Sequence, residues 1–186
     1  PISTQAYSGG FYDSVSGAKI SDLNPLIWHY TDEIRELNFN IIGSLDVDAT
    51  NIGNEETRNV LDVTSGSGIT GLSIDLSASE IIGLNPTLNF DLHVVSKKPS
   101  ANSFLVSMIS ENGDQGSKEY NFADMAVGEW INFSIPINDL VTNTSLDIKN
   151  ITSLMHLTIE GEANFYLENV STVSYTHLTL PTNGLG

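Results

Sequence analysis

Apolar and polar residues alternate one by one along much of the chain. Residues 88–94 read Leu-Asn-Phe-Asp-Leu-His-Val, and the segments 72–77, 131–137 and 155–160 repeat the pattern. Successive side chains of a strand point to opposite faces of its sheet. Alternation with a period of two therefore predicts strands that turn one face to a core and the other to solvent.

Turn-forming clusters separate these segments. They are rich in Gly, Asn, Asp, Ser and Pro, which favour tight turns, and lie at 65–68, 98–100, 111–114 and 160–162. Helix is favoured at 31–37 and in a single turn at 124–128. Short strands between regular turns, without a repeat or linker, predict one all-β domain over residues 1–173, folded as an antiparallel β-sandwich.

The C-terminal tail, residues 174–186, differs in style from the rest. It begins Ser-Tyr-Thr-His-Leu-Thr-Leu-Pro and resembles a translated sequencing-adapter read-through, which would make it non-native. The alternative is a last edge strand, because residues 175–180 also alternate. Deletion of 175–186 separates the two hypotheses: an adapter can be removed without change in melting temperature, whereas an edge strand cannot.

Composition restricts the partners of this domain. Seven Lys and Arg against 23 Asp and Glu give a net charge of −16 in 186 residues. Nucleic acids and anionic membranes are bound largely through cationic side chains, so neither is expected as a partner. No apolar run approaches the roughly 20 residues of a membrane span. Ser, Thr and Asn account for 55 residues, which favours a neutral partner rich in hydroxyl groups.

Motifs for catalysis are missing from the sequence. The chain has no cysteine and no Gly-x-Ser-x-Gly turn, so neither common nucleophile motif is present. The 23 acidic residues include no compact motif of paired carboxylates for glycoside hydrolysis. The sequence therefore indicates a protein that is not an enzyme. The histidines have no metal-ligand spacing and lie far apart, at His29, His93, His156 and His177.

Three features could bind sugars, which stack on flat rings and hydrogen-bond through hydroxyl groups. Trp28 and Tyr30 stand two apart, so an extended segment would place both rings on one face; the alternative is that they pack beneath a loop. Trp130 either reaches the outer face of its sheet or serves as framework packing. A polar loop after Met108 either shapes a cleft or is an ordinary hydrophilic hairpin, and its candidate residues are Asn112, Asp114, Gln115 and Tyr120.

The polar faces of the expected strands form a further candidate surface. If these strands are neighbours, their outward side chains would line a shallow polar groove; otherwise they form a solvated outer sheet. The side chains concerned are Asp75, Asn89, Asp91, His93, Asn132, His156, Thr158 and Glu160.

The segment 88–99, Leu-Asn-Phe-Asp-Leu-His-Val-Val-Ser-Lys-Lys-Pro, is similar to a strand of the β-sandwich modules attached to exo-acting β-glucosidases and agarases. Further pieces follow in that family's order, at 105–108, 128–140 and 146–151, and end with Phe165-Tyr-Leu-Glu-Asn-Val170. The resemblance implies a jelly roll of the galactose-binding-like type and a non-catalytic carbohydrate-binding module. It also implies a structural calcium ion near the chain ends, at Asp13 and Glu168, although members of the family often have Asp at the latter position.

Together these observations lead to one expectation and two alternatives. The expected function is binding of a neutral polysaccharide, a β-glucan or an agar-like galactan, by a secreted or cell-surface module that targets an appended glycoside hydrolase. The first alternative is a structural or interdomain β-sandwich without a ligand. The second is a small glycoside hydrolase or lyase on the same fold.

Overall fold

The computed structural model describes residues 11–12, 19–21, 27–29, 37–52, 58–79, 84–141 and 145–175. Most of these residues are in strands. The strands are β1 (Phe11–Tyr12), β2 (Lys19–Ser21), β3 (Ile27–His29), β4 (Leu37–Ile42), β5 (Leu45–Ile52), β6 (Arg58–Ser65), β7 (Ile69–Ser79), β8 (Leu84–Lys97), β9 (Ser103–Ser110), β10 (Gln115–Asn121), β11 (Trp130–Pro136), β12 (Ile151–Glu160) and β13 (Ala163–Tyr175). The helical segments are the 3-10 helix η1 (Phe122–Asp124) and the α-helix α1 (Ile137–Val141).

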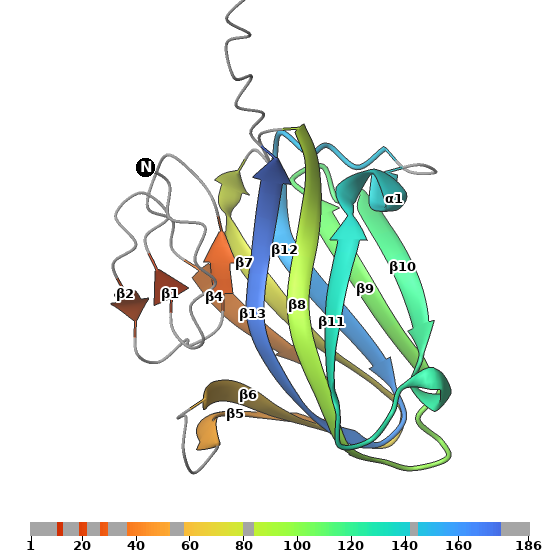
Figure 1. The fold of residues 1–186 in the computed structure, drawn as a ribbon. Helices are drawn as coiled ribbons and strands as arrows, with labels where there is room; N and C mark the ends of the chain where they lie inside the picture. Colours follow the sequence, from red (N-terminus) through yellow and green to blue (C-terminus); the bar gives the residue numbers. More distant parts are fainter. Residues whose placement is uncertain are drawn as a thin grey trace, which may run out of the picture.

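Two antiparallel sheets face each other across the core (Figure 1). One sheet has five strands in the order β10-β9-β12-β7-β4, and the other has six in the order β11-β8-β13-β6-β5. Strand β3 pairs in parallel with β13, and β1 pairs with β2 in a separate ribbon. The predicted antiparallel β-sandwich is confirmed. No helix in the described residues is long and apolar enough to cross a membrane.

The alternating segments supply the core as predicted. In β8 the apolar positions from Leu88 to Val94 are fully buried, and the polar positions between them are half-buried on the other side of the sheet. Phe104 on β9 lies at the centre of an aromatic cluster, with ring centroids 5.4–6.4 Å from those of Phe90, Phe122 and Phe165. Both sheets therefore contribute large rings to the layer between them.

Of the two helical expectations, one lies almost wholly outside the described residues and the other is wrong. Residues 31–36 lie outside the described residues, and Leu37 opens strand β4. The turn expected at 124–128 is instead η1, which ends at Asp124 and is capped where Asn121 Oδ1 accepts a hydrogen bond from the Ala123 amide (2.9 Å). Helix α1 was not expected, because Ile137 continues the alternation of β11. Its i, i+3 residues Ile137 and Leu140 are both buried, which gives this single turn its apolar face.

Three turns that carry the chain from one sheet to the other lie side by side at one end of the sandwich. The Gly161 amide donates to the Gly68 carbonyl (2.9 Å), and the Lys98 amide donates to the Glu162 carbonyl (2.9 Å). The Asn102 amide donates to the carbonyl of Glu160 (3.1 Å). Backbone hydrogen bonds thus join the β6–β7, β8–β9 and β12–β13 connections at this end.

Strand β13 continues past the expected domain boundary at residue 173. Its last residue, Tyr175, pairs with Leu84 at the start of β8. Residues 176–186 lie outside the described residues, so the nature of the tail stays a prediction.

Candidate functional site

The outer face of the five-stranded sheet, here called the polar face, carries a row of small polar residues. Each residue of this row pairs with the next one on the neighbouring strand, so that the row crosses the whole sheet. From β4 to β10 it consists of Asn40, Ser73, His156, Ser107 and Ser117.

Hydrogen bonds organise the polar face on both sides of His156. On the β7 side, Ser73 Oγ lies 3.0 Å from Ser153 Oγ and donates to Asp75 Oδ1 (2.6 Å). On the β10 side, Gln115 Nε2 donates to Ser107 Oγ (2.9 Å) and to Ser117 Oγ (3.0 Å). Asn40 also donates to the Asp75 carboxylate from β4. The polar face is therefore held in place by neutral hydroxyl and amide groups, with one carboxylate.

His156 occupies the middle of the polar face and is half-buried. Burial lowers the pKa of His156 below its ordinary value of 6.5, while the nearby Asp75 carboxylate acts in the opposite direction. The imidazole is therefore mainly neutral at pH 7. Its Nδ1 is buried and has no hydrogen-bond partner among the described residues. A neutral imidazole can both donate to and accept from a hydroxyl group of a ligand.

This pKa predicts how stability depends on pH. The folded state binds a proton at His156 less readily than the unfolded chain, so stability should fall as the pH drops through and below about 6.5. We expect the melting temperature of the His156→Gln variant to fall less than that of the unaltered protein between pH about 7.5 and about 5. Thermal melts of both proteins across this range provide the measurement. Parallel curves would contradict the assignment to His156.

The hairpin between β9 and β10 holds three of the predicted sugar-binding residues, but only one reaches the polar face. Asn112 Nδ2 donates to Asp114 Oδ2 (2.9 Å), and Asn112 Oδ1 accepts from the Asp114 amide (3.0 Å) and from Ser110 Oγ (2.6 Å). These two side chains thus stabilise their own turn. Gln115 opens β10 and extends along the polar face.

The polar strand positions identified in the sequence do not form one groove. Asp75, His156, Thr158 and Glu160 lie on the strands of the polar face. The other four lie on the six-stranded sheet, because β8 pairs with β11 and β13 rather than with β7 or β12. That second group is Asn89, Asp91, His93 and Asn132.

Trp130 lies on the outer face of the six-stranded sheet, where three rings stand in one row. The His93 ring centroid is 5.1 Å from that of Trp130 and 5.6 Å from that of Tyr166. The three strands β11, β8 and β13 place these residues directly opposite one another. Tyr166 was missed in the sequence, although its alternation with the buried Phe165 and Leu167 would have indicated its outward position. The three rings are half-buried and contact one another across the strands, so they contribute to the packing of this face, and the sugar-binding role of Trp130 stays a prediction.

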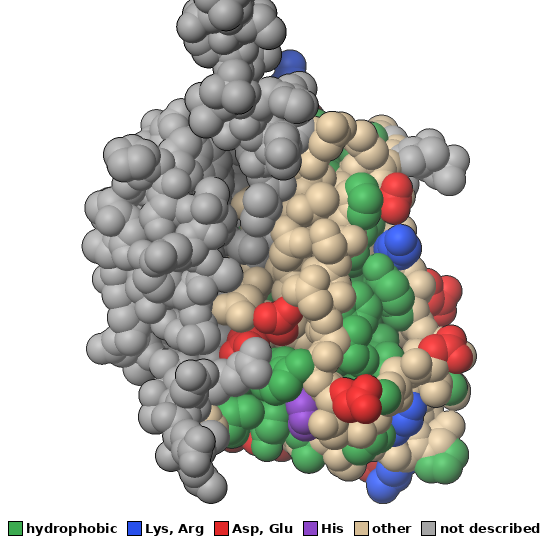
Figure 2. Space-filling view, in the orientation of Figure 1, with side chains coloured by type: hydrophobic (Ala, Val, Ile, Leu, Met, Phe, Trp, Pro, Cys, Tyr) green, Lys and Arg blue, Asp and Glu red, His purple; other side chains and the backbone are tan. Residues whose placement is uncertain are grey.

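Neutral groups cover much of this second face. The view onto the six-stranded sheet shows hydrophobic side chains, uncharged side chains and backbone over most of the described surface, with charged side chains scattered among them (Figure 2). Two of its carboxylates are paired with amides: Asn132 Nδ2 donates to Asp91 Oδ1 (2.6 Å), and Asn164 Nδ2 donates to Asp62 Oδ1 (2.6 Å).

The remaining aromatic candidates either lie apart from the polar face or have side chains outside the described residues. Tyr120 points between the sheets, and its ring stands edge-on to Phe133 with centroids 5.0 Å apart. Trp28 lies in β3, opposite Ser171 of β13, but its side chain is outside the described residues. Tyr30 is also outside them, so the placement of the two rings side by side stays a prediction.

Of the two residues expected to bind calcium, Glu168 is completely buried and Asp13 lies outside the described residues. Beside Glu168, Asn169 has a left-handed backbone (φ 54°), and its Oδ1 is buried without a hydrogen-bond partner in the described part of the chain. Asn169 Nδ2 donates to Asp91 Oδ2 (2.9 Å). A buried carboxylate and an unsatisfied carbonyl oxygen are groups that suit calcium. The described residues contain no cluster of three or more His, Cys, Asp or Glu side chains that could bind a metal by themselves.

No family model matches the chain, and a sequence search finds no similar curated protein. Solved structures do resemble it. The family 11 carbohydrate-binding module of the cellulosomal cellulase Lic26A-Cel5E of Clostridium thermocellum is 15% identical, with a TM-score of 0.52 over 78% of this chain and 93% of that module. A family 30 carbohydrate-binding module is 13% identical, with a TM-score of 0.53 over 74% of this chain and 78% of that one.

The chain also resembles one part of a larger protein. An agarase is 14% identical, with a TM-score of 0.54, and the match covers 74% of this chain but only 24% of the agarase. The present chain thus spans about a quarter of that enzyme's length. These likenesses confirm the β-sandwich fold that the sequence motifs implied.

Proposed function

We propose that this domain is a non-catalytic carbohydrate-binding module that recognises a neutral polysaccharide through the polar face. The observation that carries the proposal is the row of hydroxyl, amide and imidazole groups that crosses all five strands in register. Asn40 and Ser117 in this row are exposed and His156 is half-buried, whereas Ser73 and Ser107 are buried. Hydroxyl, amide and imidazole groups hydrogen-bond sugar hydroxyls without the cations that an acidic glycan would need. The net charge of −16 also disfavours an acidic glycan.

The proposed ligand is a β-glucan or an agar-like galactan. Support comes from the structural neighbours: the family 11 module has been solved in complex with a β-1,3-1,4-mixed-linked tetrasaccharide, and another neighbour is an agarase. In this proposal the module is secreted or displayed at the cell surface and holds an appended glycoside hydrolase close to its substrate. The benefit is a raised effective concentration of enzyme on the polysaccharide.

Affinity gel electrophoresis against laminarin, hydroxyethyl cellulose, xylan and agarose tests the proposal. We expect at least one of these polysaccharides to retard the protein, and the double variant Gln115→Ala/His156→Ala to lose most of the retardation. Ser134→Ala is the control, because Ser134 is exposed on the six-stranded sheet. Unretarded migration in all four gels would refute the function and favour a structural domain without a ligand. Release of reducing ends would favour a hydrolase.

We also propose that Glu168 and Asn169 Oδ1 contribute to a structural calcium site. We expect calcium, added after treatment with a chelator, to raise the melting temperature of the protein. The Glu168→Gln variant keeps the size of the side chain but removes its charge, so it should lose this increase. An equal melting temperature with and without calcium would contradict the site.

A further inference from the structure

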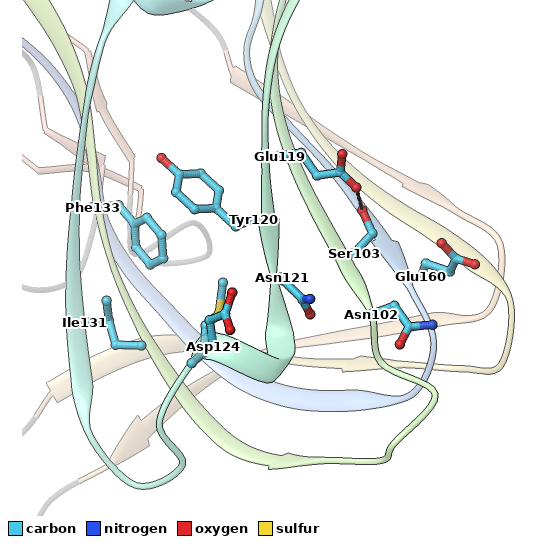
Figure 3. A pocket seen from close by; sticks show the side chains of 10 residues that line it. Asn102, Ser103, Glu119, Tyr120, Asn121, Asp124, Ile131, Phe133 and Glu160 are labelled. Atoms are coloured by element: carbon cyan, nitrogen blue, oxygen red, sulfur yellow. Dashed lines mark hydrogen bonds between the residues drawn. The ribbon is translucent and has the colours of Figure 1, made fainter.

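An open depression of about 710 Å³ surrounds the C-terminal end of β10, the edge strand of the five-stranded sheet. We call it the edge depression. Figure 3 shows that its lining comes from both sides of this strand. Its volume falls within the range of about 300–1,000 Å³ that is usual for small-molecule sites.

The first side of the edge depression is aromatic and opens between β10 and β11. Tyr120 and Phe133 point toward each other there, with Ile131 on the same side (Figure 3). Met125 also lines the depression and adds apolar surface. Phe133 is buried, whereas Tyr120 is only half-buried and can be reached from solvent. The Tyr120 ring is therefore the aromatic surface of the depression that a ligand can contact.

The second side is polar and continuous with the polar face. Ser103 Oγ donates to Glu119 Oε1 (2.8 Å), and Glu119 belongs to the row that continues through Leu105 on β9 to Thr158 on β12. Glu160 follows Thr158 by two residues and lines the same depression. A ligand that lies along the polar face can thus extend past Leu105 to the groups at the end of β10.

The carboxylates of Asp124 and Glu160 are available to such a ligand. Both residues are exposed and line the edge depression, and neither side-chain carboxylate makes a hydrogen bond or ion pair within the described part of the chain. Carboxylates accept hydrogen bonds from hydroxyl groups, and such charge-assisted bonds are among the stronger ones.

The polar face by itself lacks an aromatic contact. In the described residues, no Trp, Tyr or Phe side chain occupies an outward position of the polar face. The ring found there is the imidazole of His156. The edge depression supplies what is missing. Among the described residues, the lining of the depression includes the carboxylates of Glu119, Asp124 and Glu160 and no Lys or Arg side chain, which disfavours an acidic sugar there.

We infer that the edge depression is a second subsite, which holds one neutral pyranose unit of the glycan with its ring against Tyr120 and its hydroxyls toward Asp124 and Glu160. This inference rests on the proposed function. The proposed binding surface then extends from the outer face of the five-stranded sheet, around the edge strand β10, to the space between the two sheets.

Affinity electrophoresis with the polysaccharide that retards the unaltered protein gives the dissociation constants that test this subsite. We expect Tyr120→Ala to weaken binding about tenfold and Tyr120→Phe, which keeps the ring, to bind nearly as well as the unaltered protein. The double variant Asp124→Asn/Glu160→Gln should weaken binding by a further, separately measurable factor of a few. Glu111→Gln is its control, because Glu111 is exposed in the hairpin at the other end of β10.

The possible outcomes separate the subsite from the proposed function. If the unaltered protein binds a polysaccharide and both the tyrosine and the carboxylate variants bind it equally well, the subsite is refuted and the function stands. If the unaltered protein binds none of the four, both fall. The carboxylate variant decides alone if Tyr120→Ala proves unfolded in a thermal melt. Tighter binding of cationic chitosan oligosaccharides than of the neutral glycan would overturn the assignment to a neutral sugar.

Discussion

Replacement of Phe104 by alanine is expected to destabilise the protein by about 3–5 kcal/mol, the usual loss for a buried phenylalanine. The Phe104 side chain is completely buried on β9. Its ring stands edge-on to Phe122 (5.4 Å between centroids) and Phe165 (6.0 Å), and it also contacts Phe133 (6.3 Å). Alanine would remove the ring from the middle of this cluster and leave a cavity that rigid neighbours on two sheets cannot fill.

Urea unfolding measures this loss, with Phe104→Leu as the matched variant. Leucine keeps much of the buried apolar volume, so its cost should be clearly smaller than that of alanine. Val127→Ala serves as a surface control, because Val127 is half-exposed and such changes usually alter stability by less than about 0.5 kcal/mol. A loss below about 1 kcal/mol for Phe104→Ala would contradict the place of this ring at the centre of the core.

The identity of the core could be predicted because it depends on local periodicity. Leu88, Phe90 and Leu92 alternate with polar residues, and all three are fully buried. The pairing of the strands could not be predicted, since it depends on contacts between distant segments. Strand β8, for example, lies between β11 and β13 and not beside β7, which precedes it in the chain. For this reason the eight polar strand positions fell on two separate faces.

The same limit applies to the candidate site. The hydrophilic hairpin was correctly located in the sequence, yet composition alone could not show that Asn112 and Asp114 bond to each other while Gln115 reaches Ser107. Tyr120 was a candidate on account of its residue type. Its direction, between the sheets and toward Phe133, follows from the packing of β10 against the edge of β11, which no local pattern encodes.

The β6–β7, β8–β9 and β12–β13 turns pack closely at one end of the sandwich and leave no room for a side chain at Gly161. We therefore expect Gly161→Ala to be the second strongly destabilising change. Gly161 is buried, has φ +92°, and donates its amide hydrogen bond to Gly68. A Cβ atom at this position would lie 2.1 Å from the carbonyl oxygen of Ser100, which belongs to the neighbouring turn. The backbone of Ser100 cannot move away alone, because hydrogen bonds at Lys98 and Asn102 hold this turn against residues 160–162.

Two costs therefore add at Gly161, and a matched variant separates them. A left-handed backbone costs an alanine about 1–2 kcal/mol, and the clash should add about 1–3 kcal/mol. Gly113→Ala carries the first cost alone, because Gly113 has φ +86° and open space within 4 Å of its Cβ position. Urea unfolding should therefore show Gly161→Ala to be clearly the less stable variant. Equal losses would mean that the turns at this end of the sandwich yield to an added methyl group, and that they do not fix the sheets beside the edge depression.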